Sequence, residues 1–225
     1  EGITLTCSDP TLPSGEENLA HRAASLFFRE TGIAGGAALT LEKRIPSQAG
    51  LGGGSSDAAS ALLALRKLYA PALSDTELET MAAALGSDAP FFIRGGTQLA
   101  TGRGEVLSPL PPLTDGWFVI VKPAESFSTP AMYRRLDNLP PACTPPLPPL
   151  QDGLPALAAG LFNRFEAAIP AGSAVWDIKA RLAAYGALAS LLSGSGSAVF
   201  GLFDTETPVI PMIRTRFKSL ALFVS

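Results

Sequence analysis

The sequence predicts an α+β protein built from two lobes that meet near residue 113. Helical and strand-like apolar patterns are mixed along the chain without a strict alternation of strand and helix, which favours α+β over a parallel α/β fold. The chain has 225 residues, enough for one large domain or two small ones. After Pro109-Leu110-Pro111-Pro112 the sequence pattern changes to a short apolar run. We therefore expect domains at residues 1–113 and 114–225.

The composition is that of an ordinary globular chain and excludes several classes of protein. Hydrophobic residues make up 47% and charged residues 16%. With 17 Lys+Arg against 20 Asp+Glu, the formal net charge is −3. A mildly acidic chain predicts neither nucleic acid nor membrane as a partner, because both require basic clusters. No run of about 18 apolar residues predicts a membrane span.

The cysteines and the N-terminal residues predict a reduced, cytoplasmic protein. Residues 1–6 lack the basic and apolar regions of a signal peptide. Cys7 and Cys143 lie far apart and have no CxxC neighbours, so one cross-link stays open but reduced thiols are favoured. With one histidine, His21, the chain offers no structural zinc site.

Each expected element of the first lobe rests on a local pattern. Caps begin helices, glycine or proline ends them, and alternation of apolar and polar residues predicts a strand. The elements are a helix from a capping box at Ser14–Glu17 to Gly32, a strand at 39–45, a helix from Ser55 or Ser56 to before Pro71, and a helix capped by Ser74.

The second lobe begins with a short apolar run that predicts a buried strand at Trp117–Val121. The proline-rich residues 139–155 predict a stiff, extended connection. Further along, we expect helices near 157–169 and 177–188, a glycine turn at 193–196 and a strand at 198–203.

The most informative segment is the glycine run between the expected strand and the second helix, PSQAGLGGGSSDAA at 46–59. Glycine allows positive φ and lets a ligand approach the backbone amides, and we expect Gly53 to require such a φ. A helix that begins at Ser55 or Ser56 turns its free N–H groups and the positive end of its dipole toward the loop. The segment therefore predicts a phosphate site, to which the serine hydroxyls add donors to phosphate or a metal.

Two familiar phosphate motifs do not fit this run. A P-loop needs a lysine after the glycines, and none follows here. A dinucleotide fingerprint needs glycine where Ser55 stands.

The run does resemble the second motif of the GHMP kinase superfamily. Two further segments are similar to that superfamily: LGSDAPFF at 85–92 and the glycine motif LLSGSGSAVFGLF at 191–203. The resemblance implies a two-lobed GHMP kinase fold, with an N-terminal lobe like domain 2 of ribosomal protein S5 and a ferredoxin-like C-terminal lobe. The first strands of the N-terminal lobe are apparently missing from this chain.

Within the superfamily, EKRIPSQAGLGGGSSDAA and GSDAPFF are similar to the branch that acts on a cytidine-linked substrate. That branch implies Mg²⁺-dependent transfer of the γ-phosphate of ATP to the 2-hydroxyl of cytidine-diphospho-methylerythritol, in non-mevalonate isoprenoid synthesis. The implied partner is a small-molecule substrate, and the implied protein is a monomer or homodimer.

The resemblance also implies a set of site residues. Asp88 matches the catalytic acid/base, Asn18, Leu19 and Lys43 match residues that border the adenine, and Arg103 falls near the cytosine. No metal ligand is assigned. The phosphate loop matches Pro46, Ser47, Gln48, Ala49, Gly50, Leu51, Gly52, Gly53, Gly54, Ser55 and Ser56.

Elementary chemistry supports Asp88 independently. Phosphoryl transfer to a hydroxyl needs a carboxylate that can accept the proton, and a tight turn before an apolar run can hold that carboxylate rigid and partly desolvated. The alternative is a solvated turn residue. Asp57 in the first helical turn is favoured as a dipole-stabilised carboxylate over a metal contact. His21 is favoured as an ordinary surface or core histidine.

Parts of the family pattern have no counterpart here. The relatives begin with an Ala-Lys-Ile-Asn strand and carry a Tyr-His pair on the cytosine, and this chain starts about fifty residues into their fold. The catalytic lysine therefore lies outside the chain, and residues 205–225 match poorly. The alternatives are another GHMP kinase (for homoserine, mevalonate or a sugar), a non-catalytic nucleotide-binding fragment, and, more distantly, a nicotinamide-dependent oxidoreductase.

Overall fold

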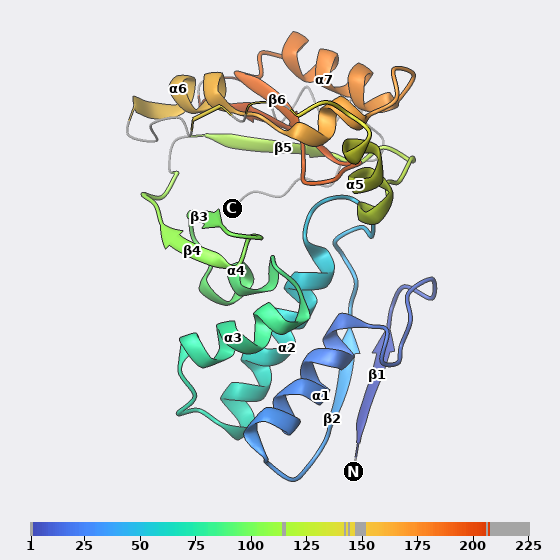
Figure 1. The fold of residues 1–225 in the computed structure, drawn as a ribbon, viewed down its shortest axis with the longest axis vertical. Coiled ribbons are helices and arrows are strands. Elements are labelled where there is room, and N and C mark those ends of the chain that lie inside the picture. Colours follow the sequence, from blue (N-terminus) through green and yellow to red (C-terminus); the bar gives the residue numbers. More distant parts are fainter. Residues whose placement is uncertain are drawn as a thin grey trace. The chain divides into compact units, whose positions relative to one another are not determined.

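The computed structural model describes residues 2–113, 116–141, 143, 145, 146, 152–205 and 207. The chain divides into two compact units (Figure 1). The first comprises Glu1–Ile45 and Gly52–Pro112, and the second comprises Pro46–Leu51 and Leu113–Ser225. The short segment Pro46–Leu51 thus belongs with the second unit although the sequence on both sides of it belongs with the first.

The first unit opens with a strand–helix–strand motif formed by β1 (Ile3–Cys7), α1 (Leu19–Thr31) and β2 (Ala37–Leu41). The two strands are parallel and pair from Ile3 with Ala37 to Cys7 with Leu41. The sequence pattern predicted β2, with bounds shifted toward residue 45, but it missed β1. Its five residues, ITLTC, alternate apolar and polar side chains, but so short a run gains its stability from a partner more than thirty residues away, which local spacing does not reveal.

The start of α1 differs from the expected capping box. The N-cap is Asn18, whose side-chain oxygen accepts a hydrogen bond from the amide of Ala20 at 2.9 Å, so the prediction that Ser14 begins the helix was wrong. The Asn18 amide group also donates to the carbonyl of Pro13 at 2.8 Å. Asparagine is as good an N-cap as serine, and its position directly before the apolar run decides the start. Gly32 ends the helix in the left-handed region, which confirms the predicted stop.

Three more helices complete the core of the first unit: α2 (Gly53–Tyr69), α3 (Asp75–Leu85) and α4 (Ala89–Arg94). Figure 1 shows α1, α2 and α3 packed against one another, and α4 lies against α2 and α3. Their shared apolar interior includes Phe27, Leu62 and Leu78, all fully buried. Burial of aromatic and aliphatic side chains of this size is the main stabilising contribution to such a cluster.

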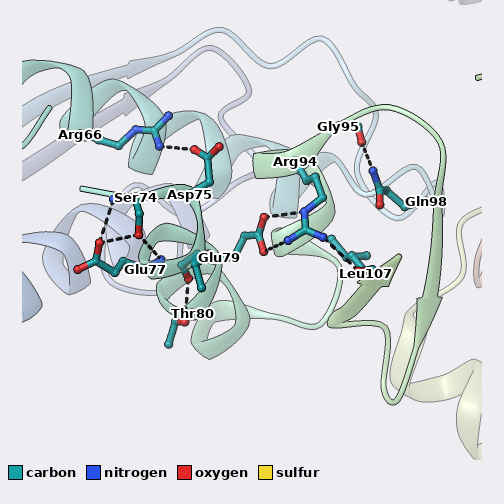
Figure 2. Close-up of polar contacts among 11 residues, drawn as sticks. Arg66, Ser74, Asp75, Glu77, Glu79, Thr80, Arg94, Gly95, Gln98 and Leu107 are labelled. Carbon is teal, nitrogen blue, oxygen red and sulfur yellow. Dashed lines mark hydrogen bonds and ion pairs between the residues drawn. The ribbon is translucent and has the colours of Figure 1, made fainter. Parts of the chain in front are cut away.

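The predicted cap of α3 is confirmed. Ser74 accepts a hydrogen bond from the amide of Glu77, and the Glu77 carboxylate accepts from the amide of Ser74 at 2.9 Å (Figure 2). The Ser74 hydroxyl also donates to the Glu77 carboxylate at 2.6 Å, and this bond, together with the bond from the Ser74 amide, lowers the pKa of Glu77. The last element of the first unit is an antiparallel hairpin of β3 (Gln98–Thr101) and β4 (Val106–Pro109), which the sequence pattern missed.

The second unit contains an antiparallel sheet in the order β5-β7-β6. The strands are β5 (Trp117–Val121), β6 (Ala189–Leu192) and β7 (Val199–Phe203); β5 and β7 were predicted and β6 was not. The fully buried Phe203 and Leu182 lie in and beside this sheet. The helical elements are α5 (Thr129–Asp137), α6 (Gly153–Gly160), the 3-10 helix η2 (Arg164–Ala168) and α7 (Ala174–Ala184).

The helices of the second unit differ from their predicted bounds. The single helix expected near 157–169 is two short ones, α6 and η2, because Asn163 caps η2 through a 2.9 Å bond from the amide of Phe165. The helix expected at 177–188 starts earlier, where Ser173 caps α7. Parts of the proline-rich connection, and residues 208–225, lie outside the described residues. Within the described chain, no helix is long and apolar enough to cross a membrane.

Candidate active site

The start of α2 presents backbone donors that no described residue uses. Gly52 is the N-cap with φ 65°, and the first helical bond runs from the amide of Ser56 to its carbonyl at 2.9 Å. Over the part of the chain that the structure describes, the amides of Gly53, Gly54 and Ser55 have no acceptor, and no side chain caps this end. The first turn also carries no acidic residue. A helix start of this kind attracts an anion, as the sequence predicted.

The hydroxyl groups of Ser55 and Ser56 add to this donor set. Both residues are half-buried, and neither hydroxyl forms a hydrogen bond to any residue that the structure describes. Hydroxyl groups held near free amides can donate to phosphate oxygens or act as ligands for Mg²⁺. The chemistry of these donors therefore fits the phosphate groups of a nucleotide.

The glycines of the run are required for two different reasons. Gly50 and Gly52 have φ values of 72° and 65°, in the left-handed region that favours glycine. Gly53 does not, so the expectation of a positive φ there was wrong: it is the first residue of α2 and has helical dihedrals. Its lack of a side chain is instead a packing requirement, because a Cβ there would lie 3.0 Å from both Ile45 and the ammonium of Lys43.

Close contacts at the same glycines bring the predicted residues of the first unit to the start of α2. A Cβ on Gly54 would lie 3.2 Å from the side chain of Leu19. A Cβ on Gly52 would lie 2.6 Å from the ring of Phe92 in α4. Leu19 and α4 are therefore neighbours of the first turn of α2, together with Lys43.

The ammonium group of Lys43 forms an ion pair with the carboxylate of Asp57. The side chains are largely buried, with 6% of Lys43 and 18% of Asp57 exposed. The expectation that Asp57 lies in the first helical turn was wrong, because α2 begins two residues earlier than predicted. Its carboxylate neutralises a buried lysine beside the helix start. The ammonium itself lies against Gly53, at the start of the helix.

Asp88 lies directly before α4 and is exposed. Its carboxylate does not cap the helix and forms no hydrogen bond with the described residues. The turn Gly86–Asp88 was predicted and is closed by a bond from the amide of Ala89 to the carbonyl of Gly86 at 3.1 Å. The expected partial desolvation of the carboxylate is absent. An exposed carboxylate without a protein partner has its lone pairs available for a substrate hydroxyl.

Arg103 lies in the turn between β3 and β4, where the sequence placed a turn. Its amide donates to the carboxylate of Glu105 at 2.9 Å, and its side chain is exposed. The turn lies next to Asp88, since a Cβ on Gly104 would be 3.5 Å from the Oδ1 atom of Asp88. The first unit thus holds an uncapped helix start, an exposed carboxylate and a cationic turn on neighbouring elements.

The preceding part of the glycine run is held by the second unit. The carbonyls of Gln48 and Ala49 accept from the amides of Ser197 and Ala198 at 3.3 and 2.9 Å. The carbonyl of Gly50 accepts from the hydroxyl of Ser193 at 2.9 Å. The predicted phosphate loop is therefore divided, with Pro46–Leu51 bound to the turn at 193–198 and Gly52–Ser56 opening α2 in the first unit.

The other residues that were singled out do not contact this helix start through their side chains. The Asn18 side chain is 8% exposed and committed to capping α1. His21, on α1, lines a groove of about 390 Å³ together with Arg22 and Leu85. No group of three or more His, Cys, Asp or Glu residues that could hold a metal occurs within the described residues. Phe92, which packs on Gly52, carried no recognisable signal in the sequence because its contact is with a glycine forty residues away.

This arrangement, on a two-lobed fold, defines a small-molecule kinase of the GHMP type. The pattern of the GHMP kinases N-terminal domain matches residues 18–96, and that of the GHMP kinases C-terminal domain matches residues 149–215. The chain therefore belongs to the GHMP kinase family.

Similar proteins narrow the branch within that family. The chain is 42% identical to 4-diphosphocytidyl-2-C-methyl-D-erythritol kinase of Synechococcus sp. (strain JA-2-3B'a(2-13)), covering all of this chain and 78% of that protein. It is 43% identical to the enzyme of the same name from Moorella thermoacetica, covering 92% and 76%.

Solved structures of GHMP kinases also resemble this chain. A crystal structure of 4-(cytidine 5'-diphospho)-2C-methyl-D-erythritol kinase matches with a TM-score of 0.70 and 40% identity, over 90% of this chain and 74% of that one. The homoserine kinase of Cytophaga hutchinsonii matches with a TM-score of 0.72 but only 18% identity, over 91% and 73%, which shows the shared fold alone.

Proposed function

We propose that this protein is an ATP-dependent kinase that phosphorylates the 2-hydroxyl of 4-diphosphocytidyl-2-C-methyl-D-erythritol in non-mevalonate isoprenoid synthesis. The observation that carries the proposal is the open, uncapped start of α2 next to the helix that Asp88 begins. The relatives that share about 40% of its residues bear the name of this enzyme. We expect it to act in the cytoplasm as a monomer or homodimer.

The phosphates of ATP bind at the first turn of α2 in this proposal. The amides of Gly53, Gly54 and Ser55 donate to phosphate oxygens, and the hydroxyls of Ser55 and Ser56 supply further donors or a ligand for Mg²⁺. Bound Mg²⁺ would neutralise charge on the phosphates. The remaining loop residues, Pro46–Leu51, are assigned to the phosphate loop by the resemblance alone.

Asn18, Leu19 and Lys43 are assigned to the part of the site that binds the adenine of ATP. Leu19 contributes an apolar surface against Gly54. The Asn18 side chain caps α1, so its amide group is not assigned a contact with adenine. Asn18 belongs to this side of the site because it directly precedes Leu19. Lys43 acts together with Asp57, which holds its ammonium beside the helix start.

Asp88 is the base in the proposed reaction. Its carboxylate accepts the proton of the substrate 2-hydroxyl while the hydroxyl oxygen forms a bond to the γ-phosphorus and the bond to ADP breaks. The exposed guanidinium of Arg103 extends from the adjacent turn and is assigned to the cytosine end of the acceptor. Both residues belong to one unit, so their spacing does not depend on how the units are placed.

The decisive experiment uses the full-length enzyme and measures ATP-dependent phosphorylation of four acceptors: the cytidine-diphospho alcohol, homoserine, mevalonate and galactose. We expect turnover with the first alone, and competition by CDP. The Asp88→Asn variant should lower kcat by about 10²- to 10⁴-fold, because it keeps the shape and removes the base. Its ATP affinity and melting temperature should match the wild type.

The exposed carboxylate of Asp137, at the end of α5, provides the matched control. Asp137→Asn removes one charge from the surface and should leave kcat unchanged. Turnover with homoserine, mevalonate or galactose instead would identify a different GHMP kinase. Wild-type kcat in Asp88→Asn would remove Asp88 from the reaction.

A further inference from the structure

Arg94, the last residue of α4, joins three elements of the first unit. Its Nε and Nη2 atoms donate to the two carboxylate oxygens of Glu79 in α3 at 2.8 and 2.6 Å. Its Nη1 atom donates to the carbonyl of Leu107 in β4 at 3.1 Å. Figure 2 shows this guanidinium between the carboxylate of Glu79 and the β4 backbone. One side chain therefore fixes α4 to α3 and the hairpin to α4.

The geometry of this contact requires arginine. A planar guanidinium forms two parallel hydrogen bonds to a carboxylate and still has a donor for a third acceptor. A lysine ammonium cannot form the same pair of parallel bonds. The Glu79 side chain is only 15% exposed, so its charge is largely removed from water and depends on this partner. A second bond, from the Gln98 side chain to the carbonyl of Gly95 at 2.9 Å, fixes the connection from α4 into β3.

The hairpin that Arg94 anchors leads to Asp88. Asp88 precedes α4, Arg94 ends it, and the helix has only six residues. The turn of the hairpin returns to the beginning of α4, where a Cβ on Gly104 would lie 3.5 Å from both Ser87 and Asp88. Arg103 is the neighbouring residue in that turn. The hairpin is thus bonded to the end of α4 at Arg94, and its turn lies close to Asp88 at the beginning of the helix.

We propose that Arg94 is a positioning residue for the acceptor substrate. Through Glu79 and the Leu107 carbonyl it holds the β3–β4 hairpin so that the turn bearing Arg103 stays beside Asp88. The inference rests on the proposed function, in which Asp88 and Arg103 face the acceptor. It extends that function to a residue whose side chain contacts neither the phosphate-binding start of α2 nor the predicted substrate residues.

The test is Arg94→Lys, assayed for phosphorylation of the cytidine-diphospho acceptor. Lysine cannot keep both bonds to Glu79 and the bond to Leu107, so the hairpin is held less firmly. We therefore expect KM for the acceptor to rise about tenfold, the factor that corresponds to the loss of one charge-assisted hydrogen bond. KM for ATP should stay within about twofold of wild type, because the start of α2 keeps its contacts. A role confined to folding would lower the yield of active protein and the melting temperature without separating the two KM values.

The matched control is Arg66→Lys. Arg66 in α2 pairs with Asp75 at the start of α3, also shown in Figure 2, and this pair touches neither α4 nor the hairpin. We expect both KM values to be unchanged in this variant. The milder change Glu79→Gln, which keeps one acceptor oxygen, should raise the acceptor KM in the same direction as Arg94→Lys and decides the matter if Arg94→Lys does not fold.

The outcomes separate the inference from the proposed function. An acceptor KM indistinguishable from wild type in both Arg94→Lys and Glu79→Gln, while the wild type is active, would overturn the positioning role and leave the proposed function standing. An equal rise of both KM values in Arg94→Lys would also overturn it. A wild-type protein that does not phosphorylate the cytidine-diphospho acceptor would overturn both proposals.

Discussion

The two glycine–serine segments of this protein have similar compositions, but their serine hydroxyls differ in hydrogen bonding. At the start of α2, the amides of Gly53–Ser55 and the hydroxyls of Ser55 and Ser56 have no partner among the described residues. In the turn at 193–197, the Ser195 hydroxyl bonds to that of Thr129 at 2.8 Å, and the fully buried Ser197 donates to the carbonyl of Glu125.

The comparison shows how to tell a ligand site from a structural turn. Buried polar groups in proteins are almost always hydrogen-bonded, so donors that remain free mark the place where a ligand can satisfy them. Several polar groups of the turn at 193–197 are bonded within its own unit, and Asn163 donates both to the carbonyl of Gly194 and to that of Leu192, at the end of β6, at 2.8 Å. We therefore interpret this turn as a scaffold and propose the start of α2 as the anion site.

Removing the charge beside the anion site should have the largest effect. Lys43→Ala leaves the largely buried carboxylate of Asp57 without a partner, and we expect a loss of roughly 3 to 5 kcal/mol in the free energy of unfolding. ATP affinity should also fall, because the positive potential at the start of α2 is reduced and an unpaired anion is left near it. Chemical denaturation and calorimetric titration with ATP measure the two effects.

A double variant separates the charge of the pair from its packing. Lys43→Met with Asp57→Leu removes both charges and should recover most of the stability, while ATP affinity stays low. ATP affinity equal to the wild type in Lys43→Ala would exclude Lys43 from the nucleotide site.

A side chain at the N-cap should produce the next largest effect. Gly52→Ala forces alanine into the left-handed region, which costs about 1 to 2 kcal/mol. It also places a Cβ 2.6 Å from the ring of Phe92, and displacing that ring costs about 1 to 3 kcal/mol more. ATP binding should weaken because the first turn of α2 shifts. The measurements are thermal unfolding and ATP titration.

Gly32→Ala is the control for the cost of the left-handed backbone conformation alone. Gly32 has almost the same φ, 66°, and a Cβ there meets nothing within 4 Å. It should cost only the roughly 1 to 2 kcal/mol of the left-handed conformation and leave ATP affinity unchanged. Equal losses in the two variants would mean that the Gly52–Phe92 contact has no energetic role.

The smallest effect is expected in the scaffold turn. Asn163→Ala removes the two bonds to the turn and the cap of η2, for a loss of about 2 to 3 kcal/mol at roughly 1 kcal/mol per bond. Asn138→Ala, which removes one exposed bond to the carbonyl of Arg134, should cost less than about 1 kcal/mol. Neither should change ATP affinity. A weaker affinity in Asn163→Ala alone would extend the nucleotide site to Pro46–Leu51, which this turn holds.

Local patterns in the sequence predicted the features that depend on neighbouring residues. The cap at Ser74, the stop at Gly32 and the strand Trp117–Val121 are confirmed, because caps, left-handed glycines and apolar runs act within a few residues. That a helix starts within the glycine run is confirmed, two or three residues earlier than predicted, whereas anion binding by that start stays a prediction. The roles of Asp88, Arg103 and the loop residues stay predictions.

Tertiary structure decided what depends on residues far apart in the chain. The strands β1, β3, β4 and β6 were missed, since a short strand is stabilised by its partner rather than by its own pattern. The sequence could not show that Asp57 pairs with Lys43, that Gly52 needs room for Phe92, or that Arg94 joins α3, α4 and β4. Each of these depends on burial and on the distance between two groups. Those quantities exist only once the chain has folded, because packing brings distant residues together and removes their charges from water.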